Sequence, residues 1–291
     1  MLNVFLRPVC AFLLVFLLDG AAVAQSRYAL VIGNAAYQSI PALKTSATDA
    51  ATVAETLRAG GYDVTELHDV RQTDTGQAMR NFLDKIAAGE PGGIAFVYYS
   101  GHAARAKGEN FLIPVDAIVG NESEIAREAF RLKWLIEELV KLPLSARIIV
   151  LDASRDHQIG SAGGKPIAKG LATSQVSPGM LIAFAATPGT IAVESDADYS
   201  LFTGTLVSQM RQPGLFLDQM LRNTRIEVNK VTAGLQTPWT RSALHAELSL
   251  FKATDQQASD PDAAPKQLRK RRSVYRDPVR VIREFLRHVP F

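Results

Sequence analysis

The sequence contains almost no cysteine. Its one cysteine among 291 residues is Cys10, close to the start of the chain. Residues 11–291 therefore carry no thiol, which excludes disulfide bonds, zinc–thiolate sites and a cysteine nucleophile from that part of the chain. The sequence also lacks a glycine motif that could cradle phosphate, spacing typical of metal ligands, and internal repeats. It therefore predicts no nucleotide, metal or other cofactor.

Long apolar runs are scarce as well. The run at 9–18 has ten residues, about half of the roughly 20 that span a bilayer. Arg7 precedes this run, Asp19 interrupts it, and the small residues Ala-Val-Ala follow at 22–24. This order is typical of a secretory signal, so we expect residues 1–24 to be removed and the mature chain to begin at Gln25. An uncleaved anchor is the alternative. Cleavage would place the protein outside the cytoplasm, in the periplasm or secreted.

Positive charge is concentrated at the end of the chain. Residues 266–291 hold nine Lys and Arg against two acids, a net charge of +7. Because the whole chain carries +3 and 1–24 is neutral, residues 25–265 carry −4. The composition of 254–265 is typical of a flexible linker. The sequence therefore predicts an acidic domain at 25–253, a linker at 254–265 and a basic tail at 266–291.

The tail contains a compact helical pattern. Asp277 and Pro278 suit its first turn, and its apolar and basic side chains fall on opposite faces. A basic amphipathic helix can lie on an anionic membrane surface, dock on an acidic partner, or pack on its own acidic domain. The sequence leaves these three alternatives open. We expect no nucleic-acid partner for an exported protein.

The body of the chain alternates between strand and helix patterns. Short apolar or alternating segments typical of strands occur at 28–32, 63–70, 94–99, 147–151 and 180–185. Helical spacing occurs from Thr45 or Ser46 to Gly60, and at 73–87, 132–142, 201–210 and 215–228. A Gly-, Lys- and Ser-rich loop fills 158–178. The alternation predicts an α/β fold with a mostly parallel sheet and helices on both faces.

Two of the predicted strands run into polar turns. His102 follows the strand at 94–99, and Ser154 follows the strand at 147–151. Functional groups collect at the carboxyl ends of parallel strands, so neighbouring strands would bring these residues together. Taken singly, each residue is more typical of an ordinary loop or turn position.

The pair and its surroundings resemble the bacterial caspase-like p20 family, which belongs with the metacaspase-like C14 peptidases. Caspases place their histidine about 50 residues before their cysteine, and here the separation is 52. The resemblance covers 27–251 through six motifs in order: YALVIGNAAY at 28–37, YYSGHA at 98–103, ENFLIPVDA at 109–117, VLDASRD at 150–156, GMLIAFAATPG at 179–189 and QTPW at 236–239. It implies a three-layer caspase-like sandwich and peptide hydrolysis by a Cys/His pair.

The resemblance also assigns roles to four positions. His102 falls on the family's acid/base histidine and Ser154 on its cysteine nucleophile. Ala103 falls where a glycine usually stands, and the backbone N–H groups of Ala103 and Ser154 would form the oxyanion hole. Asp152 falls on an acidic position that binds an Arg or Lys side chain of the substrate. The residues alone leave a second interpretation for Asp152, in which it pairs with Arg155 or caps the turn.

Serine at position 154 changes the expected chemistry. A cysteine thiol is partly ionised near neutral pH, whereas a serine hydroxyl needs a strongly coupled base that a buried carboxylate usually orients. No such carboxylate is evident behind His102 in the sequence. We therefore expect a catalytically impaired pseudo-peptidase that binds peptides or partners through its cleft. The alternative is a weak Ser/His-dependent endopeptidase that prefers Arg or Lys.

Overall fold

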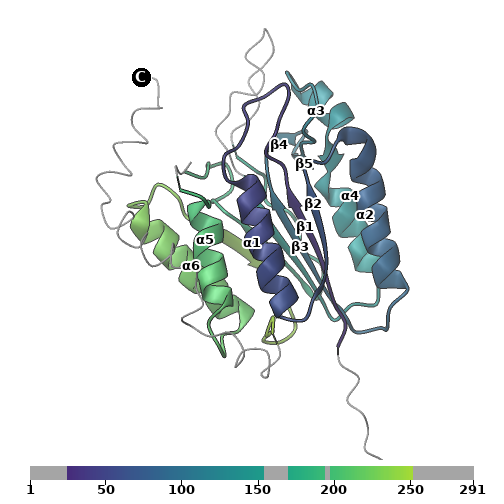
Figure 1. Ribbon diagram of the computed structural model, residues 1–291, viewed down its shortest axis with the longest axis vertical. Helices are drawn as coiled ribbons and strands as arrows, with labels where there is room; N and C mark the ends of the chain where they lie inside the picture. Colours follow the sequence, from purple (N-terminus) through teal and green to yellow (C-terminus); the bar gives the residue numbers. More distant parts are fainter. Residues whose placement is uncertain (1–24, 154–169, 194–196, 252–291) are drawn as a thin grey trace, which may run out of the picture.

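The computed structural model describes residues 25–153, 170–193 and 197–251 (Figure 1). Several expectations fall outside these residues. They concern the signal at 1–24, the nucleophile position Ser154, most of the loop at 158–178, the linker at 254–265 and the tail at 266–291. The sequence interpretation of these segments stays a prediction.

A six-stranded sheet forms the centre of the domain. Its strands are β1 (Arg27–Gly33), β2 (Asp63–His68), β3 (Ile94–Ser100), β7 (Ala146–Asp152), β8 (Met180–Phe184) and β9 (Trp239–Ser242). Their order is β2-β1-β3-β7-β8-β9, and β9 alone runs antiparallel to its neighbour. The predicted mostly parallel sheet is confirmed. All five predicted strands are present, although the second ends at His68 and not at residue 70.

Helices cover both faces of this sheet (Figure 1). One face carries α1 (Ser46–Ala59), α5 (Leu201–Met210) and α6 (Leu217–Val231), and the other carries α2 (Gln72–Ala87) and α4 (Leu132–Lys141). The strands divide their side chains between two cores. In β3, Phe96 and Tyr98 belong to the core under α1 and α5, whereas Val97 and Tyr99 belong to the core under α2 and α4. The three-layer arrangement agrees with the caspase-like α/β fold.

A second, smaller sheet was not predicted. The antiparallel strands β4 (Ala103–Ala106), β5 (Glu109–Leu112) and β6 (Phe130–Arg131) form it, and the short helix α3 (Glu122–Glu128) precedes β6. Lys107 and Gly108, both at positive φ, turn the chain between β4 and β5. These strands have two to four residues, too few for a periodic pattern to be recognised. The hairpin directly follows His102, so it fixes the direction of the chain after this residue.

Across the described ranges, every helix is too short or too polar to cross a membrane.

Arg147 joins β7 to the end of α4. Only 7% of this residue is exposed, and its guanidinium donates hydrogen bonds to the carbonyl oxygens of Leu139 (2.7 Å), Leu144 (3.3 Å) and Leu142. Burial lowers its pKa from the usual range. The carbonyls at a helix C-terminus have no partner within the helix, and the planar guanidinium supplies several of them at once.

We expect Arg147→Met to lower the free energy of unfolding by about 3 kcal/mol, because the carbonyls of Leu139, Leu142 and Leu144 lose a hydrogen bond together. Arg147→Lys should cost about 1–2 kcal/mol, since an ammonium can replace only part of the fork. Urea unfolding measures both. Arg58→Met is the matched control, because Arg58 is half exposed and pairs with Glu66 at the surface. An Arg147→Met protein as stable as the Arg58→Met protein would show that water satisfies these carbonyls.

Candidate active site

The carboxyl ends of β3 and β7 lie side by side. The two strands are parallel neighbours, and their last residues, Ser100 and Asp152, are register partners. The N–H of Gly101 donates to the carbonyl of Asp152 at 3.3 Å. The segment that carries His102 therefore leaves the sheet beside the buried Ala153. The predicted adjacency of the two strands is confirmed. Ser154, the next residue, lies outside the described residues, so its position beside His102 stays a prediction.

The imidazole of His102 is held by the loop between β1 and α1. His102 is 1% exposed, and its Nε2 lies 2.8 Å from the carbonyl oxygen of Pro41. A carbonyl oxygen only accepts, so Nε2 carries the proton, and the lone pair of the neutral ring is on Nδ1. The Tyr37 ring packs edge-on against the imidazole, with 4.5 Å between centroids. A main-chain carbonyl thus orients the ring, as a carboxylate does in a serine triad, but without the negative charge of a carboxylate.

The backbone of the His102 turn is also fixed, by two tyrosines. The N–H of His102 donates to Tyr37 Oη at 2.7 Å, and Tyr99 Oη donates to the carbonyl of His102 at 2.7 Å. Burial raises the pKa of Tyr99, so its hydroxyl stays protonated as a donor. A Cβ on Gly101 would lie 2.7 Å from the oxygens of both tyrosines, which makes glycine necessary there. The turn is therefore rigid on both sides of Gly101.

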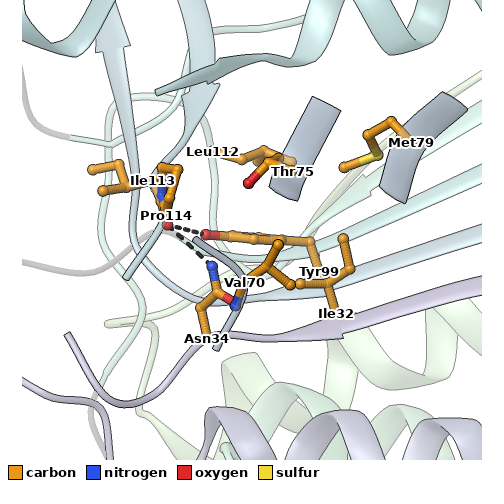
Figure 2. A pocket seen from close by; sticks show the side chains of 9 residues that line it. All are labelled: Ile32, Asn34, Val70, Thr75, Met79, Tyr99, Leu112, Ile113 and Pro114. Carbon is orange, nitrogen blue, oxygen red and sulfur yellow. Dashed lines mark hydrogen bonds between the residues drawn. The ribbon is translucent and has the colours of Figure 1, made fainter. Parts of the chain in front are cut away.

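The tyrosines share a further acceptor, the carbonyl of Ile113. Tyr37 Oη and Asn34 Nδ2 each donate to it at 3.2 Å. The single proton of Tyr99 Oη is shared between it, at 3.1 Å, and the closer carbonyl of His102. Figure 2 shows Tyr99 and Asn34 converging on this oxygen beside a small, mostly apolar cavity. The connection between β5 and α3 is thereby joined to the His102 turn.

Asp152 belongs to a buried acidic cluster. It is fully buried, and its Oδ2 accepts hydrogen bonds from the hydroxyls of Ser200 and Thr203, the latter at 2.8 Å. Asp49, on α1, is fully buried as well and accepts from the N–H of Ser200 at 2.8 Å and from Ser100 Oγ at 3.3 Å. The two carboxylates are thus linked through Ser200, which also caps the start of α5.

Asp152 is hydrogen-bonded to residues that are distant from it in the sequence. The partners of Asp152 come from a helix about 50 residues later in the chain, which local sequence could not indicate. Burial, together with the charges of Asp49 and Asp152, raises the pKa of Tyr98 well above its usual value. Sequence analysis missed Asp49, although an acid that falls in line with the apolar positions Val53 and Leu57 was a detectable signal.

Ala103 adopts an ordinary strand conformation. It is the first residue of β4, and it is the register partner of Leu112. Among the described non-glycine residues, positive φ occurs at Asp69, Lys107 and Ala233, and Ala103 is not one of them. The backbone at this position therefore does not require glycine, and alanine fits here without conformational strain.

Within 25–153, 170–193 and 197–251, no three His, Cys, Asp or Glu side chains are grouped so that they could hold a metal ion.

Fold, strand order and the placement of His102 define an α/β domain of the caspase type. The family model described as caspase domain, peptidase C14, matches residues 26–249, and the chain belongs to this family. The mucosa-associated lymphoid tissue lymphoma translocation protein 1 homolog of Mus musculus is 33% identical over 98 residues, which are 34% of this chain and 11% of that protein. Its Homo sapiens counterpart is 33% identical over 94 residues, 32% of this chain and 11% of that protein. The matched segments thus span about a tenth of these relatives.

Proposed function

We propose that this protein is a caspase-domain pseudo-peptidase that binds peptides or proteins through an Arg or Lys side chain. The observation that carries the proposal is the position of the acidic cluster. Asp49 and Asp152 lie at the edge of the sheet from which the His102 turn leaves. Two carboxylates in a buried site favour a cationic partner over a neutral one, because charge–charge attraction is strong where water is excluded.

The proposed loss of catalysis follows from Ser154 and from the partner of His102. A serine nucleophile passes its proton to the histidine, so the imidazolium must be stabilised as it forms. The carbonyl of Pro41 orients the ring but offers only a dipole, whereas a carboxylate would offer a full negative charge. A thiolate forms without this help, because the pKa of cysteine lies near neutrality. The same histidine would thus serve a cysteine well and a serine poorly.

One observation favours the second candidate, a weak Ser/His endopeptidase. With Nε2 protonated, Nδ1 is the basic atom of His102, so the ring has the tautomer that a general base needs. Residual hydrolysis after Arg or Lys would then come from this base alone.

Turnover of fluorogenic peptides that end in Arg or Lys separates the two candidates. We expect the wild-type protein to release no more fluorophore than Ser154→Ala, which serves as the control for contaminating peptidases. Hydrolysis by the wild-type protein that Ser154→Ala abolishes would replace the pseudo-peptidase with the serine endopeptidase.

We also propose export through residues 1–24. For the basic tail, an anionic membrane, an acidic partner and its own acidic domain remain the three alternatives. Association that disappears at high salt and on deletion of residues after Pro265 would support the tail's role.

A further inference from the structure

The loop at 34–45 supplies two groups that contact the His102 ring. Tyr37 packs on the imidazole, and the carbonyl of Pro41 accepts its Nε2–H. This loop contains no helix or strand. Within the loop, the N–H groups of Tyr37 and Leu43 both donate to the carbonyl of Ala35 at 3.0 Å, so Ala35 must be held for these two groups to stay in place.

Asp69 provides this support at the first turn of the loop. Its Oδ1 accepts the N–H groups of Ala35 at 2.7 Å and Ala36 at 2.8 Å. The N–H of Asp69 in turn donates to the carbonyl of Gly33 at 3.0 Å. Two successive backbone N–H groups that point at one oxygen form an anion-binding concavity, and here a side-chain carboxylate fills it. Asp69 thus joins the end of β2 to the start of the loop.

The residues next to Asp69 strengthen the same junction. Asn34 Oδ1 accepts the N–H of Val70 at 3.0 Å, and the N–H of Asn34 donates to the carbonyl of Ser100 at 2.9 Å. Asn34 also reaches the carbonyl of Ile113, as Figure 2 shows. The loop is therefore tied to β2, to the end of β3 and to the connection after β5, all within a few residues of Tyr37.

The backbone of Asp69 has a conformation that is unusual for a residue other than glycine. Its φ is +49°, in the left-handed region that glycine adopts at no cost and that other residues disfavour. Asp and Asn tolerate this region better than most residues do, because their short polar side chains bond to nearby backbone groups. At Asp69 the two hydrogen bonds that the carboxylate accepts offset part of the cost of this backbone conformation.

We propose that Asp69 is a positioning residue for His102. It does not touch the imidazole. It holds Ala35 and Ala36 so that Tyr37 and the Pro41 carbonyl stay in contact with the ring, which keeps the proton on Nε2 and the lone pair on Nδ1. The inference goes beyond the proposed function: it rests on His102 as the acid/base residue that the second candidate uses and that a Ser154→Cys protein would need.

The test is the tautomer of His102, observed in the full-length protein by long-range ¹H–¹⁵N NMR and assigned with His102→Gln. We expect the wild-type ring to be entirely in the Nε2–H form. Asp69→Gly keeps the left-handed backbone but removes the acceptor, so both tautomers should appear. Asp63→Gly is the matched control, because Asp63 is an exposed acid on β2 that pairs with Lys85, and it should leave the tautomer unchanged.

A folded Asp69→Gly protein with an unchanged His102 tautomer would overturn the proposal. If Asp69→Gly does not fold, Asp69→Asn decides the question, because it keeps the shape and loses the charge. Charge-assisted hydrogen bonds are about twice as strong as neutral ones, so the amides of Ala35 and Ala36 should exchange about 10-fold faster in Asp69→Asn. Unchanged exchange of these amides together with an unchanged tautomer would also overturn it.

This readout is independent of the proposed function. It needs neither peptide binding nor turnover, so a protein that binds no basic peptide still tests the role of Asp69. In a Ser154→Cys background that does react, Asp69→Gly should slow labelling by a thiol-directed peptide about 10-fold, as expected for a displaced base.

Discussion

The Ser154→Cys protein should react with a thiol-directed inhibitor built on a peptide that ends in Arg or Lys, and it should cleave such peptides. The change restores a group that is partly ionised near neutral pH next to the motif that carries His102. Hydrolysis should exceed that of the wild-type protein by at least about 10²-fold, in line with the usual contribution of general acid–base catalysis to a competent nucleophile. Mass spectrometry of the labelled protein is the sharper measurement, since it needs one alkylation and no turnover.

Two further variants control this result. Residues 11–291 have no other thiol, so the wild-type protein should stay unlabelled there. His102→Gln in the Ser154→Cys background should remove most of the labelling. Adding Ala103→Gly should change the rate by less than about 3-fold, because Ala103 already has an ordinary strand conformation. A folded Ser154→Cys protein that neither labels nor cleaves across a broad peptide library would mean that the cleft has been lost and that the domain acts as a scaffold.

Neutralising the acidic cluster should abolish the preference for Arg and Lys. Asp49→Asn and Asp152→Asn each keep an oxygen that can accept the hydrogen bonds from Ser200 but remove a charge from the site. Loss of one partner of a buried charge pair typically costs 2–5 kcal/mol, so kcat/KM for an Arg peptide relative to an Ala peptide should fall by about 10²-fold. The measurement uses the Ser154→Cys background. Fluorescence anisotropy of labelled peptides gives the same comparison for binding alone.

The matched control for this pair is Asp218→Asn, since Asp218 is an exposed acid in the first turn of α6. Selectivity that is unchanged in both cluster variants would assign Asp49 and Asp152 a structural role, that of linking α1, β7 and α5 through Ser200. Because both carboxylates are buried and already bound to Ser200, a basic side chain must displace these contacts. We therefore expect association to be slower than diffusion permits.

Sequence reasoning succeeded where a pattern repeats along one element. Four of the parallel strands, β1, β3, β7 and β8, are apolar runs because both of their faces are buried, and such runs are visible without a structure. The other, β2, is only partly buried and was recognised by its alternation. The pairing of β3 with β7 then followed from the position of motifs at strand ends. β9 was missed because three of its four residues are exposed and the strand shows no apolar alternation.

The unpredicted parts of the site depend on contacts between distant segments. Pro41 contributes its main-chain carbonyl. Every residue has such a group, so the residue type at position 41 does not indicate the contact. Ser200 reaches Asp49 and Asp152 across about 150 and 50 residues of chain, so no local window contains the cluster. Asp69 and Ala35 are likewise 34 residues apart. These arrangements follow from the order of the strands, which brings the loops after β1, β2 and β3 together.

Gln25 and Phe251, the first and last described residues, lie at the amino ends of the parallel strands, whereas His102 follows the carboxyl end of β3. Gln25 donates to the carbonyl of Gly92 just before β3, and Phe251 is buried against Gly60, where α1 ends. β1 has seven residues, so about 23 Å separates the two edges of the sheet. Residues that precede Gln25 or follow Phe251 therefore join the domain at the end of the sheet away from His102.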